Sequence, residues 1–263
     1  MNKPVAIIGM GEMGELFAHA FLKLGHPVYP IVRGMDLASI ATALPDPELV
    51  LVAVGENQLH GVLNTLPSPW RGRLALLQNE LLPRDWQQHG ITDPTVIVVW
   101  FDKKPGRPFV AATATPVCGP KAELIAQALE TLAIPCHTVP RTELLYELAR
   151  KNLYILTINI AGLMLAPGGT VGELWDNSRD LADKVAADII SVQQALAECE
   201  LPRKRLLDSL PDAIADDPGH LCLGRSARER LRRTLQNAQA QGIRAPSLKA
   251  IAETLAAQHG ESL

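Results

Sequence analysis

A Gly-x-Gly-x-x-Gly motif near the amino terminus constrains the fold of this chain more than any other feature. Gly9, Gly11 and Gly14 directly follow the apolar run 5–8, and a helix-like apolar periodicity comes next, before a second apolar run at 28–32. The motif alone is common by chance, so its meaning depends on a strand before it and a helix after it. Both are expected here, and the chain is therefore predicted to begin with the first βαβ unit of a dinucleotide-binding fold.

Each of the three glycines meets a requirement of dinucleotide binding. Gly9 permits a tight turn from strand to helix, Gly11 lets the backbone approach a pyrophosphate, and Gly14 lets the helix pack closely on the strands. The amino terminus of the helix presents unpaired N–H groups and a partial positive charge to the phosphates. The candidate cofactor-binding residues of this loop are Gly9, Met10, Gly11, Glu12, Met13 and Gly14.

The end of the second expected strand distinguishes NAD from NADP. An NAD enzyme usually places Asp or Glu there to hold the ribose 2′-OH, whereas this chain has Arg33. An arginine binds a 2′-phosphate that a carboxylate would repel, so the predicted cofactor is NADP(H). Asp36 is expected to cap the next helix, 37–44, instead. The alternative for Arg33 is a solvated cation at the end of a strand.

Composition and charge exclude several classes of function. The chain has 263 residues, of which 47% are hydrophobic and 20% charged, and its net charge is −3. This charge gives no general reason to expect nucleic acid or an anionic membrane as a partner. The most apolar stretch, 153–166, is shorter than the roughly 20 residues of a membrane-spanning helix. The expected partner is a small molecule, and whether the chain forms a homodimer is left open.

The cysteines and histidines do not predict a metal site. The four cysteines are widely spaced without a CxxC pair, and the seven histidines form no HxxxH or HExxH pattern. The first strand is expected to begin near Pro4, which leaves no room for a signal peptide. Scattered cysteines suit a reducing compartment, so a cytoplasmic protein without disulfides or bound metal is expected.

Strand and helix signals alternate only in the first half of the chain. Apolar strand-like runs are followed or separated by helical periodicity, which is typical of an open, mostly parallel, doubly wound sheet. The expected strands are 48–54, 73–77, 95–100 and 109–117, and the expected helices are 58–66 and 121–132. After Pro140 only helical patterns remain, at 143–165, 177–200, 204–210, 227–241 and 247–258. The prediction is an N-terminal Rossmann domain, 1–140, and an all-helical C-terminal domain, 141–263, which completes the substrate site.

Lys151 and Asn159 are candidates for chemistry on a substrate. Reduction of a carbonyl by hydride leaves negative charge on oxygen, so a proton donor must lie close by. The two residues are eight positions apart, which places them about 80° apart around a helix, two turns along. A lysine at the mouth of an apolar helix can act as a general acid near neutral pH. Alternatively, Lys151 is a surface lysine and Asn159 is a buried amide that bonds to a neighbouring helix.

A series of motifs in order along the chain resembles the ketopantoate reductase family, NADPH-dependent reductases of 2-dehydropantoate in the 6-phosphogluconate dehydrogenase-like superfamily. The matching features are the glycine motif, Arg33, Val54 at the end of the run 52–54, Gln58, Asn79, Lys151 with Asn159, and the segments 172–174 and 242–246. The resemblance implies that Val54, Gln58 and Asn79 border the cofactor. It further implies that Lys151 is the general acid, and that Asn79 and Asn159 contact the substrate.

Four positions depart from the family pattern. Gly55 replaces a lysine near the cofactor phosphates, Glu80 replaces a glycine after Asn79, and Ile155 replaces a second asparagine. Ser226 falls at the position of an acidic residue that binds the substrate hydroxyl, and Glu229 is expected on another face of its helix.

The predicted function is therefore an NADPH-dependent reductase of a small keto acid or ketone, with Lys151 as proton donor and Asn79, Asn159 and Ser226 at the substrate. One arginine of the basic stretch 225–233 could bind a substrate carboxylate. Two alternatives stay open: a non-catalytic NADP-binding sensor or partner-binding protein, and a reductase of another substrate class such as a cyclic imine.

Overall fold

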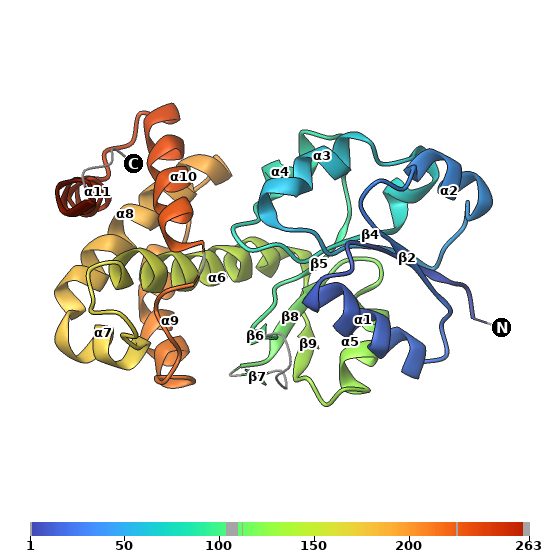
Figure 1. Ribbon diagram of the computed structural model, residues 1–263, viewed down its shortest axis with the longest axis horizontal. Coiled ribbons are helices and arrows are strands. Elements are labelled where there is room, and N and C mark those ends of the chain that lie inside the picture. Colours follow the sequence, from blue (N-terminus) through green and yellow to red (C-terminus); the bar gives the residue numbers. More distant parts are fainter. Residues whose placement is uncertain (1, 104–109, 112, 225, 260–263) are drawn as a thin grey trace. The chain divides into compact units, whose positions relative to one another are not determined.

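The computed structural model describes residues 2–103, 110–111, 113–224 and 226–259 (Figure 1). The chain divides into two compact units, Met1–Leu148 and Ala149–Leu263. The long helix α6 (Arg141–Gly162) contributes residues to both of them.

A seven-stranded sheet forms the centre of the first unit, with strand order β2-β1-β3-β4-β5-β8-β9. The strands are β1 (Val5–Ile8), β2 (Val28–Ile31), β3 (Leu49–Val52), β4 (Leu74–Leu76), β5 (Thr95–Ile97), β8 (Thr115–Cys118) and β9 (Cys136–Thr138). All neighbours pair in parallel except β5 and β8, which are antiparallel. This confirms the predicted doubly wound, mostly parallel sheet.

Helices cover the sheet of the first unit. In Figure 1, α3 and α4 lie above the strands, and α1 and α5 lie below them. The helices are α1 (Glu12–Lys23), α2 (Leu37–Ala43), α3 (Leu59–Asn64), α4 (Pro83–Gln87) and α5 (Ala122–Glu130), with short 3-10 turns η1 (Glu56–Gln58) and η2 (Ser68–Arg73). Every residue of β1 and β3 is buried, which is why these strands read as continuous apolar runs rather than as alternating patterns.

The second unit is helical. Its elements after α6 are α7 (Val171–Asn177), α8 (Arg179–Ala197), α9 (Arg203–Ala215), α10 (Ala227–Ala240) and α11 (Pro246–His259). A buried carboxylate on α8 fixes the start of α11, because Asp188 Oδ2 accepts hydrogen bonds from the backbone N–H groups of Ser247 (2.7 Å) and Leu248 (3.2 Å). Through the described part of the chain, no helix combines the length and the hydropathy that crossing a membrane requires.

The strand expected at 109–117 is wrong as a single element. Positions 109 and 112 lie outside the described residues, and the rest of the run divides into β7 (Val110–Ala111) and β8. β7 pairs with β6 (Phe101–Asp102) in a separate two-stranded sheet, whereas β8 pairs with β5. The sequence pattern does not reveal where one strand ends and the next begins to pair with a different neighbour. The prediction therefore joined two strands into one.

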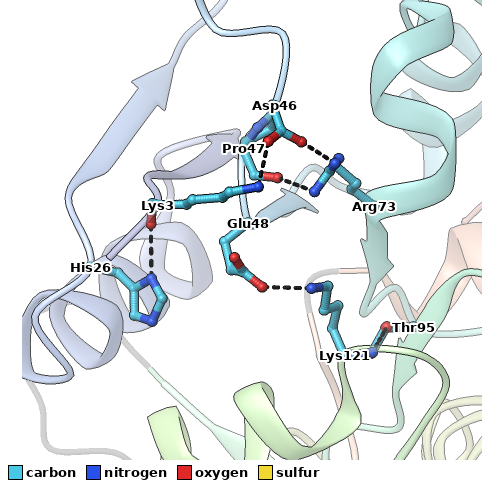
Figure 2. A network of polar contacts seen from close by, with 8 residues as sticks. All are labelled: Lys3, His26, Asp46, Pro47, Glu48, Arg73, Thr95 and Lys121. Atoms are coloured by element: carbon cyan, nitrogen blue, oxygen red, sulfur yellow. Dashed lines mark hydrogen bonds and ion pairs between the residues drawn. The ribbon is translucent and has the colours of Figure 1, made fainter. Parts of the chain in front are cut away.

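A charged network lies at the amino ends of the strands in the first unit (Figure 2). Glu48, just before β3, accepts a hydrogen bond from Lys121 Nζ at 2.5 Å, and this bond holds the pKa of its carboxyl below the usual value. Arg73, just before β4, donates to the carbonyl of Pro47 (2.9 Å) and pairs with Asp46. These ion pairs occupy the edge of the sheet opposite to the glycine motif, so they are structural.

Candidate functional site

The turn between β1 and α1 can be formed only by glycine at its first position. Gly9 has φ +98°, a conformation that side chains rarely adopt, and an added Cβ would lie 2.7 Å from the carbonyl oxygen of Ala53. Its N–H donates to the carbonyl of Ile31 (2.9 Å), so the turn is fixed against β2 on one side and the end of β3 on the other.

The other two glycines of the motif differ sharply in their surroundings. Gly14 lies inside α1, where an added Cβ would collide with the carbonyl oxygen of Gly9. Gly11 is the N-cap of α1, and its Cβ position has open space to at least 4 Å. No side chain caps the helix there among the described residues. The first-turn N–H groups of a helix have no intrahelical partner, so this open end fits a pyrophosphate.

A lysine compensates an acidic residue at this helix end. Glu12 begins α1, and a carboxylate there would repel the phosphates of a dinucleotide. Its Oε2 lies 3.3 Å from the Nζ of Lys103, which follows β6. The pair keeps the local charge near neutral and places a cation beside the glycine loop.

The residues after β2 include an exposed arginine and an aspartate whose carboxylate is already hydrogen-bonded within the protein. Arg33 is exposed. Asp36 caps α2, because its carboxylate accepts from the N–H of Ala38 (3.3 Å) and of Ser39 (3.0 Å). The hydrogen bonds from Ser39, including one from its hydroxyl, lower the pKa of Asp36. The predicted capping role of Asp36 is confirmed.

Hydrogen bonds join the ends of β3 and β4. The Nδ2 of Asn79 donates to Glu56 Oε1 at 3.1 Å. The buried Gln78 donates through Nε2 to the carbonyls of Val52 (2.7 Å) and Val54 (3.2 Å). Gln78 and Glu56 are not among the residues predicted from the sequence, although the polar pair Gln78–Asn79 directly after a buried strand was a visible signal. Gln58 is exposed at the end of η1.

The backbone conformation at Glu80 explains why a glycine would suit this turn. Its φ is +63°, in the left-handed region that costs a non-glycine residue about 1 kcal/mol or more. The chain therefore keeps the turn after Asn79 although it lacks the glycine that the resemblance leads one to expect.

In the second unit, Lys151 and Asn159 lie on α6. Lys151 is half-buried, with its Nζ 5.8 Å from the ring centroid of Tyr154. The Tyr154 ring is buried, and this burial raises the pKa of its hydroxyl. Ile155, one turn beyond Lys151, is also half-buried. The cation at position 151 thus stands at the margin between buried and accessible surface.

Asn159 is buried and forms hydrogen bonds through both ends of its amide. Its Oδ1 accepts from an Nη of Arg230 at 2.6 Å, and its Nδ2 donates to the carbonyl of Cys222 at 3.0 Å. Gly162, one turn later on α6, has no room for a Cβ because Cys222 lies against it. Asn159 therefore fixes a buried arginine of α10 and the segment around Cys222.

The candidates on α10 differ in position. Ser226 is half-buried and precedes the helix as its N-cap. Glu229 is exposed and pairs with Arg232 and Arg233, and the hydrogen bond from Arg232 lowers its pKa. Arg225 lies outside the described residues. The candidate residues thus fall into two groups: the glycine loop, Arg33, Val54, Gln58 and Asn79 in the first unit, and Lys151, Asn159 and Ser226 in the second.

Of the comparisons with known proteins, the one with solved structures shows the fold. No family model matches the sequence, and no curated protein matches it. Three solved structures of similar fold illustrate the likeness. A 2-dehydropantoate 2-reductase from Methylococcus capsulatus has a TM-score of 0.69 at 13% identity, covering 99% of both chains. A dimeric ketopantoate reductase from Staphylococcus aureus has a TM-score of 0.61 at 16% identity, covering 98% of this chain and 99% of that one. D-mandelate dehydrogenase in complex with NADH has a TM-score of 0.65 at 15% identity, covering 99% and 100%. The chain therefore shares its fold with these proteins.

The contrast between Gly14 and Gly11 gives a matched test of the loop. Gly14→Ala is expected to lower the free energy of unfolding by about 2–3 kcal/mol, because the new methyl group collides with the Gly9 carbonyl. Gly11→Ala should change it by less than about 1 kcal/mol, since the space is open. Urea unfolding followed by circular dichroism measures both, and equal destabilisation would contradict this account of the loop.

Proposed function

We propose that the chain is an NADP(H)-dependent reductase of a small keto acid, built on the ketopantoate reductase type of fold. The main observation behind the proposal is the open amino terminus of α1 at Gly11. On either side of it, Gly9 in the turn and Gly14 in the helix have no room for a side chain. A helix amino terminus with this backbone access is what a pyrophosphate requires. A small keto acid is the proposed class because the second unit offers both a proton donor for the carbonyl oxygen, Lys151, and an arginine that suits a carboxylate, Arg230.

In this proposal the first unit binds the cofactor. The loop 9–14 and the N–H groups of α1 hold the pyrophosphate, Arg33 binds the 2′-phosphate, and Val54, Gln58 and Asn79 border the nicotinamide side. Bound NADPH supplies the hydride. Lys103, held beside Glu12, supplies a cation near the phosphates in a chain that has Gly55 after β3.

Lys151 is the proposed proton donor. A lysine ammonium beside a carbonyl oxygen stabilises the negative charge that develops there, and it delivers the proton that completes the alcohol. The buried ring of Tyr154 lies beside this ammonium, with its centroid 5.8 Å from Nζ.

Arg230 is the proposed contact for the substrate carboxylate. Its fork of N–H donors matches a carboxylate, and a hydrogen bond to Asn159 fixes its orientation. Asn159 then acts as a positioning residue, because both ends of its amide already bond within the protein. Ser226, one turn before Arg230, is proposed to face the same substrate.

A second candidate is a non-catalytic NADP-binding sensor. The engagement of Asn159 by Arg230 and Cys222 favours it, because an amide used within the protein is not offered to a substrate. A reductase of a cyclic imine is a further alternative. Oxidation of NADPH followed at 340 nm against keto acids, ketones and cyclic imines separates the three: a sensor binds NADPH and oxidises it with none.

Assembly and location belong to the same proposal. The dimeric enzyme among the structures of similar fold supports a homodimer, which sedimentation velocity would test. The four free cysteines support a reducing, cytoplasmic location.

Replacement of Lys151 tests the reductase directly. Lys151→Ala should lower kcat by about 100-fold or more, because general acid catalysis is lost, while the Kd for NADPH stays within about twofold. Lys204→Ala, an exposed lysine on α9, serves as the control. An unchanged kcat, or loss of NADPH binding together with turnover, would refute the role of Lys151.

Replacement of Arg33 tests the choice of cofactor. Arg33→Gln should raise the Kd for NADPH about tenfold or more and leave the Kd for NADH nearly unchanged, since a charge-assisted contact to phosphate contributes about 1.5–3 kcal/mol. Fluorescence titration with both dinucleotides measures this, with Arg203→Gln on α9 as the matched control. A parallel change for NADH and NADPH would show that Arg33 does not contact the 2′-phosphate.

Replacement of Arg230 tests the substrate class. Arg230→Lys keeps the charge but loses the fork, so KM for a keto acid should rise about tenfold while KM for the corresponding keto amide changes little. The ratio of the two KM values within one variant is insensitive to the fraction of folded protein. An equal change for acid and amide would remove Arg230 from the substrate site.

A further inference from the structure

Two histidines from different elements of the first unit face each other directly. The Nδ1 of His60 on α3 lies 3.0 Å from the Nε2 of His89, which follows α4. The ring centroids are 5.3 Å apart and the planes differ by 31°. The centroid distance exceeds the nitrogen distance by about two ring radii, so the two nitrogens meet head on. This is the geometry of an N–H···N hydrogen bond.

The geometry suits a shared proton and excludes a metal ion between the rings. In a tetrahedral zinc site two imidazole nitrogens lie about 3.3 Å apart and each points at the ion, whereas these two nitrogens point at each other at 3.0 Å. Among the described residues, no group of three or more His, Cys, Asp or Glu side chains could hold a metal ion.

The partners of the outer nitrogens assign the direction of the hydrogen bond. His89 Nδ1 lies 3.0 Å from Asn64 Oδ1, which can only accept, so His89 donates from Nδ1 and accepts at Nε2. His60 must then donate from Nδ1. Its Nε2 lies 3.9 Å from the Oδ1 of Asp85. The Nε2 of Gln88 lies 3.5 Å from the Nδ1 of His60, and since both groups are donors in this assignment, the contact is not a hydrogen bond.

This arrangement accepts one additional proton but not two. A proton at Nε2 of His60 keeps the hydrogen bond and lies on the side of Asp85, whose Oδ1 is 3.9 Å away. A second would bind at Nε2 of His89, and two donors on two cations would then face each other at 3.0 Å. The hydrogen bond between α3 and the segment after α4 would be lost.

The surrounding charges also disfavour the second proton. Arg71 on η2 donates to the His89 carbonyl, and Arg84 on α4 is a second nearby cation. Burial, the cation of His60 and that of Arg71 all lower the pKa of His89. Asp85 and Glu80 are the acidic groups nearby, and burial raises the pKa of Asp85.

The pair ties together the two elements that carry candidate cofactor residues. α3 begins directly after Gln58, and α4 begins shortly after Asn79. Asn79 and Glu56 form the inner hydrogen bond between these segments, and His60 and His89 form the outer one. We propose that the His60–His89 hydrogen bond is a pH-sensitive latch between α3 and the segment after α4. Near neutral pH it holds the segments that carry Gln58 and Asn79 together, and it breaks when both rings are protonated. Its regulatory part rests on the proposed NADP(H) site.

Nuclear magnetic resonance on the full chain labelled with 15N-histidine tests the latch without any ligand. His89 should appear as the Nδ1–H tautomer at pH 7.5, and it should take up its proton only after His60 as the pH falls. His60→Gln removes the neighbouring cation, so the midpoint for His89 should shift to higher pH. His137→Gln, an exposed histidine on β9, should leave both rings unchanged. Independent titration of His60 and His89 would overturn the latch.

NADPH affinity tests the regulatory part. His89→Gln keeps an acceptor for His60 and cannot take up a proton. Between pH 7.5 and pH 5.5 the Kd of the natural chain should rise about fivefold more than that of His89→Gln, a coupling at the low end of those between sites. The 2′-phosphate titrates near pH 6 in both proteins, so only this ratio reports on the latch. The natural chain and His137→Gln should behave alike.

The affinity and nuclear magnetic resonance experiments distinguish failure of the regulation from failure of the proposed function. Equal pH dependence of the Kd in the natural chain and His89→Gln, with NADPH bound, overturns the regulation and leaves the proposed function standing. No NADPH binding at any pH overturns the proposed function and the regulation together, whereas the nuclear magnetic resonance titration still decides whether the two rings share a proton.

Discussion

The contact between Gly14 and Gly9 is the constraint on which the first unit depends. It brings α1 against the turn after β1 at a distance that no side chain would permit, so the helix amino terminus points across the carboxyl end of the sheet. The apolar residues of α1, including the fully buried Phe17 and Phe21, then complete the core with Ile7 and Leu51. The position of the candidate phosphate site and the packing of the sheet are consequences of the same contact.

The two edges of the sheet have opposite electrostatic characters. At the amino ends of the strands, ion pairs such as Glu48–Lys121 join residues before β3 and after β8, and they leave the charges compensated (Figure 2). At the carboxyl ends, α1 keeps an uncapped amino terminus beside the Glu12–Lys103 pair. The uncapped amino terminus of α1 therefore offers N–H donors to an anion at the edge where ligands of open α/β sheets bind.

The sequence was sufficient for features that depend on neighbouring residues and insufficient for those that depend on distant ones. The glycine loop, the capping by Asp36 and the helical second half follow from local patterns. The division of 109–117 into β7 and β8 depends on which strands they pair with, and α4 is too short to show a helical period. The engagement of Asn159 by Arg230 and the His60–His89 pair each join residues far apart in the chain. Contacts of this kind cannot be predicted from the spacing of residues along the chain. The roles of the candidate site residues therefore stay predictions.

The strained turn at Glu80 connects the candidate site to the histidine pair. A non-glycine residue keeps a left-handed conformation only where the surrounding contacts stabilise it by more than the strain costs. On one side, Asn79 bonds to Glu56; on the other, Asp85 holds the N–H of Leu82 at 2.7 Å, and the His60–His89 bond fixes the end of α4. Loss of the outer bond removes one of the contacts that oppose this strain. A proton at His89 can thus act on Asn79 through the backbone of this turn without any contact between the two side chains.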